Sequence, residues 1–216
     1  MAKLKVGVLI SGRGSNLQAL IDAGRDETYP AEITLVISNR GDAAGLARAE
    51  AAGIPTKIIP HRQFADREGF DAALDESLTA AGVGLVCLAG FMRILTPWFA
   101  ARWCDRLVNI HPSLLPAFKG LDAHAQALAA GVRFSGCTVH FVTPEMDAGP
   151  IIVQAAVPVL DGDDEHRLAD RILEAEHRCY PLAVRLIAEE RVQVTGQRVL
   201  VADGQPPAEA AINPRA

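Results

Sequence analysis

The stretch Leu4-Lys5-Val6-Gly7-Val8-Leu9-Ile10-Ser11-Gly12-Arg13-Gly14-Ser15-Asn16 decides the fold. Its first seven residues form a short apolar run with β-branched side chains, which predicts a buried strand. Two closely spaced glycines follow, and residues 16–23 then show the apolar spacing of a helix. A strand, a glycine turn and a helix are the opening of a βαβ unit.

The same alternation continues through the first half of the chain. Strands are predicted at 33–38, 56–59, 85–89 and 107–110, with helices at 43–52, at 66–80 and after Thr96-Pro97. Strands that are continuously apolar and alternate with helices are typical of a parallel sheet covered on both faces. We therefore predict an α/β fold with an open, mostly parallel, twisted sheet.

The pattern changes after residue 111. A loop rich in proline and glycine precedes a helix at 123–130, two strands at 137–142 and 151–157, a long amphipathic helix at 163–190 and a small hairpin at 192–201. These strands are joined by loops too short for a crossover helix, so we expect antiparallel additions to the sheet. We predict one domain over 1–202 and a loose tail over 203–216.

Composition excludes several classes of protein. The chain has 216 residues, half of them hydrophobic, and a formal net charge of -5. It lacks the dense basic face that binding to a nucleic-acid backbone requires, and no apolar run approaches the ~20 residues that span a bilayer. The start Met1-Ala2-Lys3 leads directly into a strand rather than a signal peptide. We expect a cytoplasmic protein without nucleic-acid or membrane partners.

The glycine turn predicts an anion site. Backbone N–H groups at the start of a helix bind phosphate, and Ser15-Asn16 adds side-chain donors. A dinucleotide fingerprint would need glycine where Leu17 stands, and the second strand ends in Ser38-Asn39-Arg40 without an acidic ribose ligand. Arg40 leaves binding of an NADP 2′-phosphate open, and a purely structural turn is the simplest alternative.

Asn109 and His111 are the candidate catalytic pair. They alternate on one predicted strand, so their side chains point to the same side at its carboxyl end, where open α/β sheets bind ligands. Two polar groups on an apolar strand are costly to bury unless they are used. A histidine that changes charge near neutral pH and an amide donor together suit a developing oxyanion.

Asp147 is the candidate partner of that histidine. It lies in Asp147-Ala148-Gly149-Pro150, which is also an ordinary turn signal, so a turn residue is the alternative. A Ser-His-Asp hydrolase is disfavoured because no G-x-S-x-G occurs, and the histidines show no metal-binding spacing. We therefore expect no metal site.

Four segments together resemble the folate-dependent phosphoribosylglycinamide formyltransferases, within the wider family of 10-formyltetrahydrofolate formyltransferases. They are Ile10-Ser11-Gly12-Arg13-Gly14-Ser15-Asn16-Leu17, Leu88-Ala89-Gly90-Phe91-Met92-Arg93-Ile94-Leu95, Asn109-Ile110-His111-Pro112-Ser113-Leu114-Leu115-Pro116 and the Asp147 turn. The resemblance covers about residues 4–190 and implies a Rossmann-like formyltransferase fold. The length leaves no room for the extra domains of the related tRNA formyltransferases and deformylases.

The resemblance also implies roles for individual residues. The N-terminal half, about 1–108, would bind the nucleotide phosphate, and the C-terminal half, about 109–202, would bind folate and carry the catalytic residues. The catalytic set would be Asn109, His111 and Asp147; the nucleotide contacts Gly14, Ser15, Asn16 and Glu176; and the folate contacts Arg67, Met92, Arg93, Ile94, Leu95, Asn109, Thr143 and Asp147. Leu173 stands where relatives have a polar residue. His124 and His140 are expected to pack near the site without an assigned role.

The reaction implied is transfer of the formyl group of 10-formyltetrahydrofolate to the amine of 5-phosphoribosylglycinamide (GAR), a step of purine (IMP) biosynthesis. The amine attacks directly, so no protein nucleophile, metal or nicotinamide is expected. Asn109 and protonated His111 would stabilise the oxyanion, and Asp147 would keep His111 protonated. Hydrolysis of formyltetrahydrofolate and NADP binding are the alternatives, and both a monomer and a homodimer are compatible with the sequence.

Overall fold

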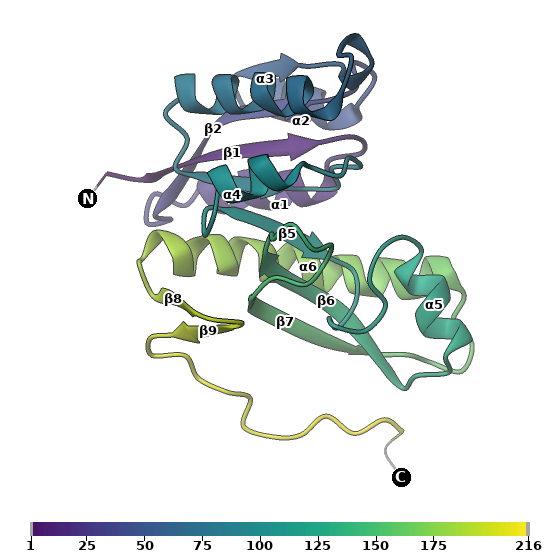
Figure 1. Ribbon diagram of the computed structural model, residues 1–216. Helices are drawn as coiled ribbons and strands as arrows, with labels where there is room; N and C mark the ends of the chain where they lie inside the picture. The colour runs from purple at the N-terminus through teal and green to yellow at the C-terminus, as the bar shows by residue number, and fades with distance from the viewer. Residues whose placement is uncertain (1, 215–216) are drawn as a thin grey trace.

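A seven-stranded sheet in the order β3-β2-β1-β4-β5-β6-β7 forms the centre of the molecule (Figure 1). The structure is a computed structural model that describes residues 2–214. The strands are β1 (Leu4–Ile10), β2 (Ala31–Ser38), β3 (Thr56–Ile58), β4 (Leu85–Leu88), β5 (Leu107–His111), β6 (Phe134–Phe141) and β7 (Ile151–Pro158). β1 to β5 are parallel, whereas β6 and β7 pair antiparallel. The predicted mostly parallel sheet with antiparallel additions is confirmed.

Helices cover both faces of the sheet. One face carries α1 (Ser15–Gly24), α2 (Ala44–Ala51) and α6 (Glu165–Ala188), and the opposite face carries α3 (Arg67–Ala80) and α4 (Pro97–Arg102). A 3₁₀ turn η1 (His61–Gln63), helix α5 (Ala123–Ala129) and a separate hairpin, β8 (Val192–Thr195) with β9 (Arg198–Val201), complete the fold.

Helix starts follow side-chain caps that the sequence supplies. The side chains of Asp66, Thr96 and Asp164 accept backbone N–H groups three residues later, at the starts of α3, α4 and α6. Each cap satisfies a donor that has no partner within the helix. These caps explain why the predicted helices begin within a residue or two of the observed ones.

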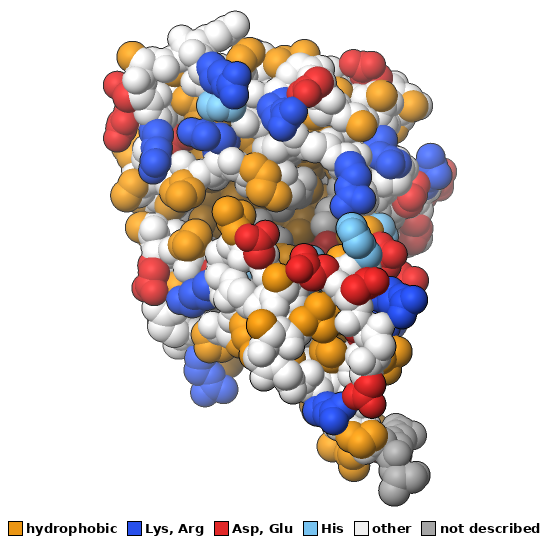
Figure 2. Space-filling model, turned by 90° about the vertical axis from the view of Figure 1, so that its right-hand side faces the viewer, with side chains coloured by type: hydrophobic (Ala, Val, Ile, Leu, Met, Phe, Trp, Pro, Cys, Tyr) orange, Lys and Arg blue, Asp and Glu red, His pale blue; other side chains and the backbone are white. Residues whose placement is uncertain are grey.

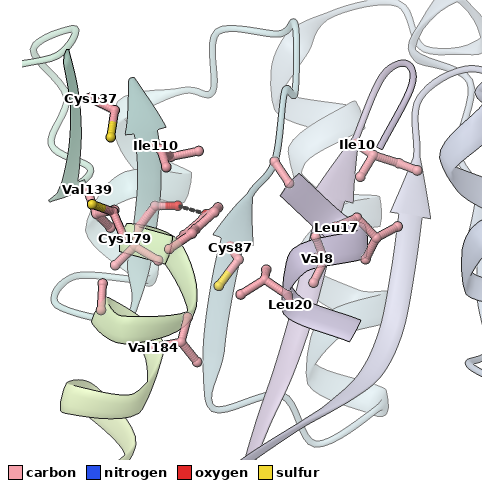
Figure 3. Close-up of a cluster of buried hydrophobic side chains, with 14 of the residues drawn as sticks. Val8, Ile10, Leu17, Leu20, Cys87, Ile110, Cys137, Val139, Cys179 and Val184 are labelled. Atoms are coloured by element: carbon pink, nitrogen blue, oxygen red, sulfur yellow. Dashed lines mark hydrogen bonds between the residues drawn. The ribbon is translucent and has the colours of Figure 1, made fainter. Parts of the chain in front are cut away.

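The larger core lies between the sheet and the layer of α1 and α6. Figure 3 shows Val8 and Ile10 from β1 facing Leu17 and Leu20 from α1, with Val184 of α6 in the same cluster. The fully buried Tyr180 hydroxyl donates to the carbonyls of Leu88 and Val108, at 2.9 and 3.2 Å. Helix α6 is thereby fixed to the last residue of β4 and to the second residue of β5.

Several predicted strand boundaries were wrong by one to three residues, and two of them lie beside the candidate site. β5 extends to His111 because His111 pairs with Thr138 across the ladder to β6. β6 begins at Phe134, three residues before the predicted start, because Phe134 still pairs with Pro158 of β7. Both extensions depend on strand pairing, which local apolar periodicity does not encode.

The segment after Val201 has no helix or strand up to residue 214. Asn213 nevertheless donates its side-chain amide to the carbonyls of Arg133 and Val159, at 2.7 and 3.0 Å. The predicted loose tail is therefore held at one point, while residues 215–216 lie outside the described part. Within residues 2–214, no helix combines the length and the apolarity needed to cross a membrane.

Candidate active site

A hollow of 630 Å³ lies at the carboxyl edge of the sheet. Its volume falls within the range of about 300–1,000 Å³ that is common for sites of small ligands. Figure 2 faces this edge and shows the surface hollowed there, with basic side chains gathered above the hollow. The lining comes from the loops after β1, β2, β4 and β5 and from α6. It includes Gly14, Ser15, Asn16, Met92, Arg93, Ile110, His124, Leu173 and Glu176.

The turn between β1 and α1 forms a preorganised anion cradle. Gly14 has φ 71°, in the left-handed region, and it precedes the free N–H groups of the first turn of α1. A Cβ on Gly14 would lie 2.6 Å from the Cα of Gly45 in α2. The Gly45 N–H also donates to the Gly12 carbonyl at 3.0 Å. Contact with α2 therefore fixes the turn, and only glycine fits at position 14.

Glu176 and Asn16 form a buried polar pair between α6 and α1. The Asn16 side-chain amide donates to Glu176 Oε2 at 2.7 Å. Burial raises the pKa of Glu176 to about 7, although the bond from Asn16 opposes this shift. Asn16 Oδ1 is buried and has no hydrogen-bond partner among the described residues. A ligand with hydroxyl donors would satisfy this oxygen and the free carboxylate oxygen.

Leu173 lies one turn before Glu176 on α6 and also lines the cleft. An apolar side chain offers no hydrogen bond to a ligand at this point. Leu173 therefore makes the wall of the cleft beside Glu176 apolar.

His111 is buried between two acceptors. Its Nε2 lies 2.9 Å from the Phe118 carbonyl oxygen, which only accepts, so Nε2 carries a proton. Its Nδ1 lies 3.5 Å from Asp147 Oδ2. A neutral ring with its proton on Nε2 would turn a lone pair toward that carboxylate. Both ring nitrogens of His111 therefore face acceptors, one on Phe118 and one on Asp147.

His140 completes this cluster and was not assigned a role from the sequence. Its Nδ1 donates to the Phe141 carbonyl at 2.8 Å, which leaves Nε2 to accept from the Asn109 amide at 3.4 Å. Burial lowers the pKa of His140, so the ring is neutral at pH 7. It therefore orients the Asn109 amide. Asn109 pairs directly with His140 across β5 and β6, and only knowledge of this register would have identified the contact.

The loop after β6 brings Asp147 to the histidines. Asp147 has φ 49°, an unusual conformation that aspartate tolerates better than most residues. Its Oδ2 accepts the Gly120 N–H at 2.9 Å, and its Oδ1 lies 3.7 Å from His140 Nε2. A Cβ on Gly149 would collide with the Phe141 carbonyl. This close approach folds the loop back over β6 and places the carboxylate.

The predicted folate residues lie beside the cleft in two groups. Met92 and Ile94 are 67% and 63% exposed, which is unusual for such apolar side chains and suits stacking against a flat ligand. Arg67, Arg93 and Ile94 line a second hollow of 220 Å³. The remaining two are less open: Leu95 packs against the core beneath α3 and α4, and the Thr143 hydroxyl donates to the Glu145 carbonyl.

The residues that left NADP binding open are already paired. The Arg40 guanidinium donates twice to the Asp42 carboxylate, at 2.9 and 2.7 Å. Asn39 uses its amide oxygen to accept from Ser11 and its amide nitrogen to contact His61. Both side chains therefore have partners within the folded chain. Among residues 2–214, no three His, Cys, Asp or Glu side chains are grouped as a metal would require.

Comparison with known proteins finds a matching family model and close relatives in sequence and in structure. A family model described as Formyl transferase matches residues 4–184. The phosphoribosylglycinamide formyltransferase of Escherichia coli (strain K12) is 46% identical over 191 residues, which cover 88% of this chain and 90% of that protein. The crystal structure of glycinamide ribonucleotide transformylase 1 from Symbiobacterium toebii superposes with a TM-score of 0.91 at 52% identity, covering 93% of this chain and 95% of that one.

Longer proteins also contain a similar segment. The trifunctional purine biosynthetic protein adenosine-3 of Gallus gallus is 55% identical over 192 residues, which cover 89% of this chain. This match covers 19% of the chicken protein, so the chain spans about a fifth of the length of that relative.

Gly14 provides a test of the cradle. We expect Gly14→Ala to raise the dissociation constant for ribose 5-phosphate at least about tenfold, since strain of 1–3 kcal/mol at this turn displaces the N–H donors. Calorimetric titration measures the effect. Gly24→Ala, at the other end of α1, is the control because a Cβ there meets nothing within 4 Å. Equal dissociation constants for ribose 5-phosphate in the two variants would contradict the assignment of this turn as a phosphate-binding cradle.

Glu176 provides a test through stability. Its pKa is raised in the folded chain, so the folded state binds the proton more tightly than the unfolded state. The free energy of unfolding contributed by this group is therefore present below pH 4.5 and is lost as the pH rises through about 7. We expect urea denaturation to show that Glu176→Gln reduces this loss between pH 5 and pH 8 by up to about 2–3 kcal/mol.

The matched control for this measurement is Glu174→Gln, an exposed residue on the same helix. It should leave the pH dependence of the wild-type protein unchanged. If Glu176→Gln behaves in the same way as this control, burial does not raise the pKa of Glu176 as described above.

Proposed function

The chain belongs to the formyl transferase family, and on that premise we propose that it transfers the formyl group of 10-formyltetrahydrofolate to the amine of GAR. The products are formyl-GAR and tetrahydrofolate, in purine (IMP) biosynthesis. One observation carries the proposal: a phosphate cradle, a buried carboxylate and the Asn109–His111–Asp147 cluster meet at one edge of the sheet.

GAR is assigned to the α1 side of the cleft. Its phosphate accepts the N–H groups of Gly14, Ser15 and Asn16, because a helix N-terminus favours an anion. Its ribose hydroxyls donate to Glu176 and to the unpartnered Asn16 Oδ1. This placement directs the glycinamide amine away from the cradle and toward β5.

The folate is assigned to the side lined by the 92–95 segment. Met92, Ile94 and Leu95 contact the pterin and benzoyl rings, and Thr143 and Asp147 lie on the facing loop. Arg67 and Arg93 supply positive charge for the glutamate carboxylates. The fit rests on exposed apolar side chains beside two arginines, a pattern that suits a flat ligand with an anionic tail.

Residues 1–202 are proposed to act as one unit. Asn16 from the first half bonds to Glu176 from the second, and the cleft is lined by both halves. The sequence-based division into a nucleotide half at 1–108 and a folate half at 109–202 stays a prediction. Each substrate contacts both halves in this assignment.

The geometry around His111 supports direct transfer. The amine of GAR attacks the formyl carbon, and the carbonyl oxygen becomes an oxyanion that accepts from His111 and the Asn109 amide. His111 Nε2 donates to the Phe118 carbonyl, 2.9 Å away, so the oxyanion would accept this hydrogen bond in place of Phe118. Charge-assisted donation to the oxyanion is stronger than donation to a neutral carbonyl, which favours this exchange as charge develops. Placing both reactants in one cleft lowers the barrier further.

Asp147 has two proposed roles. Its negative charge stabilises the imidazolium form of His111, which the oxyanion requires at neutral pH. With a water molecule, it also moves the proton from the attacking amine to the departing folate nitrogen. No serine or cysteine nucleophile is needed, because the acceptor amine forms the new bond. A cytoplasmic location without nucleic-acid partners stays a prediction.

The proposed activity is tested by a spectrophotometric assay of folate product. We expect product only when both 10-formyltetrahydrofolate and GAR are present, and no calorimetric signal with NADPH. Product without GAR would favour the hydrolase alternative, and tight NADPH binding would favour the nucleotide-binding alternative. No product under either condition would contradict the proposal.

Asp147→Asn tests the catalytic assignment. Asparagine tolerates the same positive φ, so the loop should keep its shape while the charge is lost. We expect kcat to fall by on the order of a hundredfold or more, with little change in GAR affinity.

The control is Glu145→Gln, an exposed acid in the same loop. It should keep wild-type kcat. An Asp147→Asn enzyme with wild-type kcat would instead make Asp147 a turn residue and would transfer the catalytic role to another acid.

A further inference from the structure

A row of hydrogen bonds crosses the carboxyl edge of the parallel strands. The Met92 N–H donates to Ser11 Oγ at 2.8 Å, and the Ser11 hydroxyl donates to Asn39 Oδ1 at 2.7 Å. The Asn39 amide then donates to His61 Nδ1 at 3.2 Å. These four residues follow β4, β1, β2 and β3, so the row runs along the sheet in its spatial order.

Ser11 is the centre of this row because it belongs to both substrate sides. It immediately precedes the cradle turn, where α2 holds Gly12 through the Gly45 N–H. Its hydroxyl also holds the first residue of the 92–95 segment. Ser11 and Asn39 are 5% and 4% exposed, so no water competes freely for these bonds.

The far end of the 92–95 segment is fixed independently. Thr96 donates its N–H and its hydroxyl to Asp71 Oδ2 of α3, both at 2.7 Å. Asp71 is 1% exposed. The exposed side chains of Met92 and Ile94 therefore project from a short span held at both ends, and only the Ser11 end connects to the cradle.

We infer that Ser11, held by Asn39, is a positioning residue that couples the two substrate sites. This inference rests on the proposed function. Phosphate contacts add to those by which α2 holds the cradle turn, and the Ser11 hydroxyl transmits this added restraint to Met92, so that each substrate strengthens the binding of the other. Such coupling is reciprocal by thermodynamic necessity. Neither Ser11 nor Asn39 touches the reacting atoms in this assignment.

The test uses tetrahydrofolate, which binds but carries no formyl group to transfer. Its dissociation constant is measured by calorimetry alone and with saturating GAR. We expect GAR to tighten tetrahydrofolate binding to the wild-type protein at least about fivefold. In Ser11→Ala this ratio should fall to within about twofold of one, while GAR alone binds nearly as well as to the wild type.

Ser77→Ala is the matched control. Ser77 is also a buried serine, and its hydroxyl accepts from Lys57 Nζ and donates to the Ala73 carbonyl, both at 2.8 Å. It does not line the cleft, so its variant should keep the wild-type ratio. A general loss of stability would affect both variants, and thermal unfolding reports that loss separately.

Asn39→Leu is the second variant and guards against a Ser11→Ala protein that fails to fold. It removes the acceptor of the Ser11 hydroxyl and should lower the ratio as Ser11→Ala does. A wild-type ratio in either folded variant, or a ratio of one in the wild-type protein, would overturn the inference. Failure of the wild-type protein to bind GAR and tetrahydrofolate at all would contradict the proposed function as well.

Discussion

The shared direction of β1 to β5 is the constraint on which the site depends. Parallel strands end at one edge of the sheet, where backbone groups and polar side chains leave the ladder and need other partners. Ser11, Asn39 and Asn109 all lie at such ends. Ser11 bonds to Asn39 between neighbouring loops, and Asn109 contacts His140 on the adjacent strand β6, whereas Asn16 Oδ1 has no partner among the described residues. The site therefore combines a rigid frame with a few groups that still need a ligand.

Helix α6 packs on one face of the sheet and lines the cleft at this edge, but its buried Glu176 lowers the stability of the folded chain at neutral pH. It brings Glu176 next to Asn16 across 160 residues of sequence, and burial of the carboxylate raises its pKa to about 7. A carboxylate held this way weakens the folded state at neutral pH but is available to bind hydroxyl donors. The Tyr180 hydroxyl, bonded to the carbonyls of Leu88 in β4 and Val108 in β5, holds the helix in place despite that cost. Stability and binding thus oppose each other at one residue.

Much of the fold was predictable because its signals are local. The apolar run of β1, the glycine turn and the caps of α3 and α4 fix elements through neighbouring residues alone. Alternation on β5 also predicted that Asn109 and His111 share a side. The pairing of Asn109 with His140 was not predictable, because register between β5 and β6 is set by long-range packing.

The same limit applies to the polar contacts of the loops. The bond from His111 to the Phe118 carbonyl and the row through Ser11 join segments whose approach depends on the whole fold. Glu176 was identified only through resemblance to a family, since its contact with Asn16 has no local signal. Local sequence patterns therefore predicted the candidate catalytic residues, whereas their partners depend on the tertiary structure.

A single-turnover experiment distinguishes direct transfer between two bound substrates from transfer through the protein and from hydrolysis. Excess enzyme is mixed with GAR and 10-formyltetrahydrofolate that carries ¹⁴C in the formyl group, and the reaction is quenched with acid at short times. We expect the label to pass from folate to formyl-GAR with none on the protein. Labelled protein, or labelled formate released in place of formyl-GAR, would contradict it.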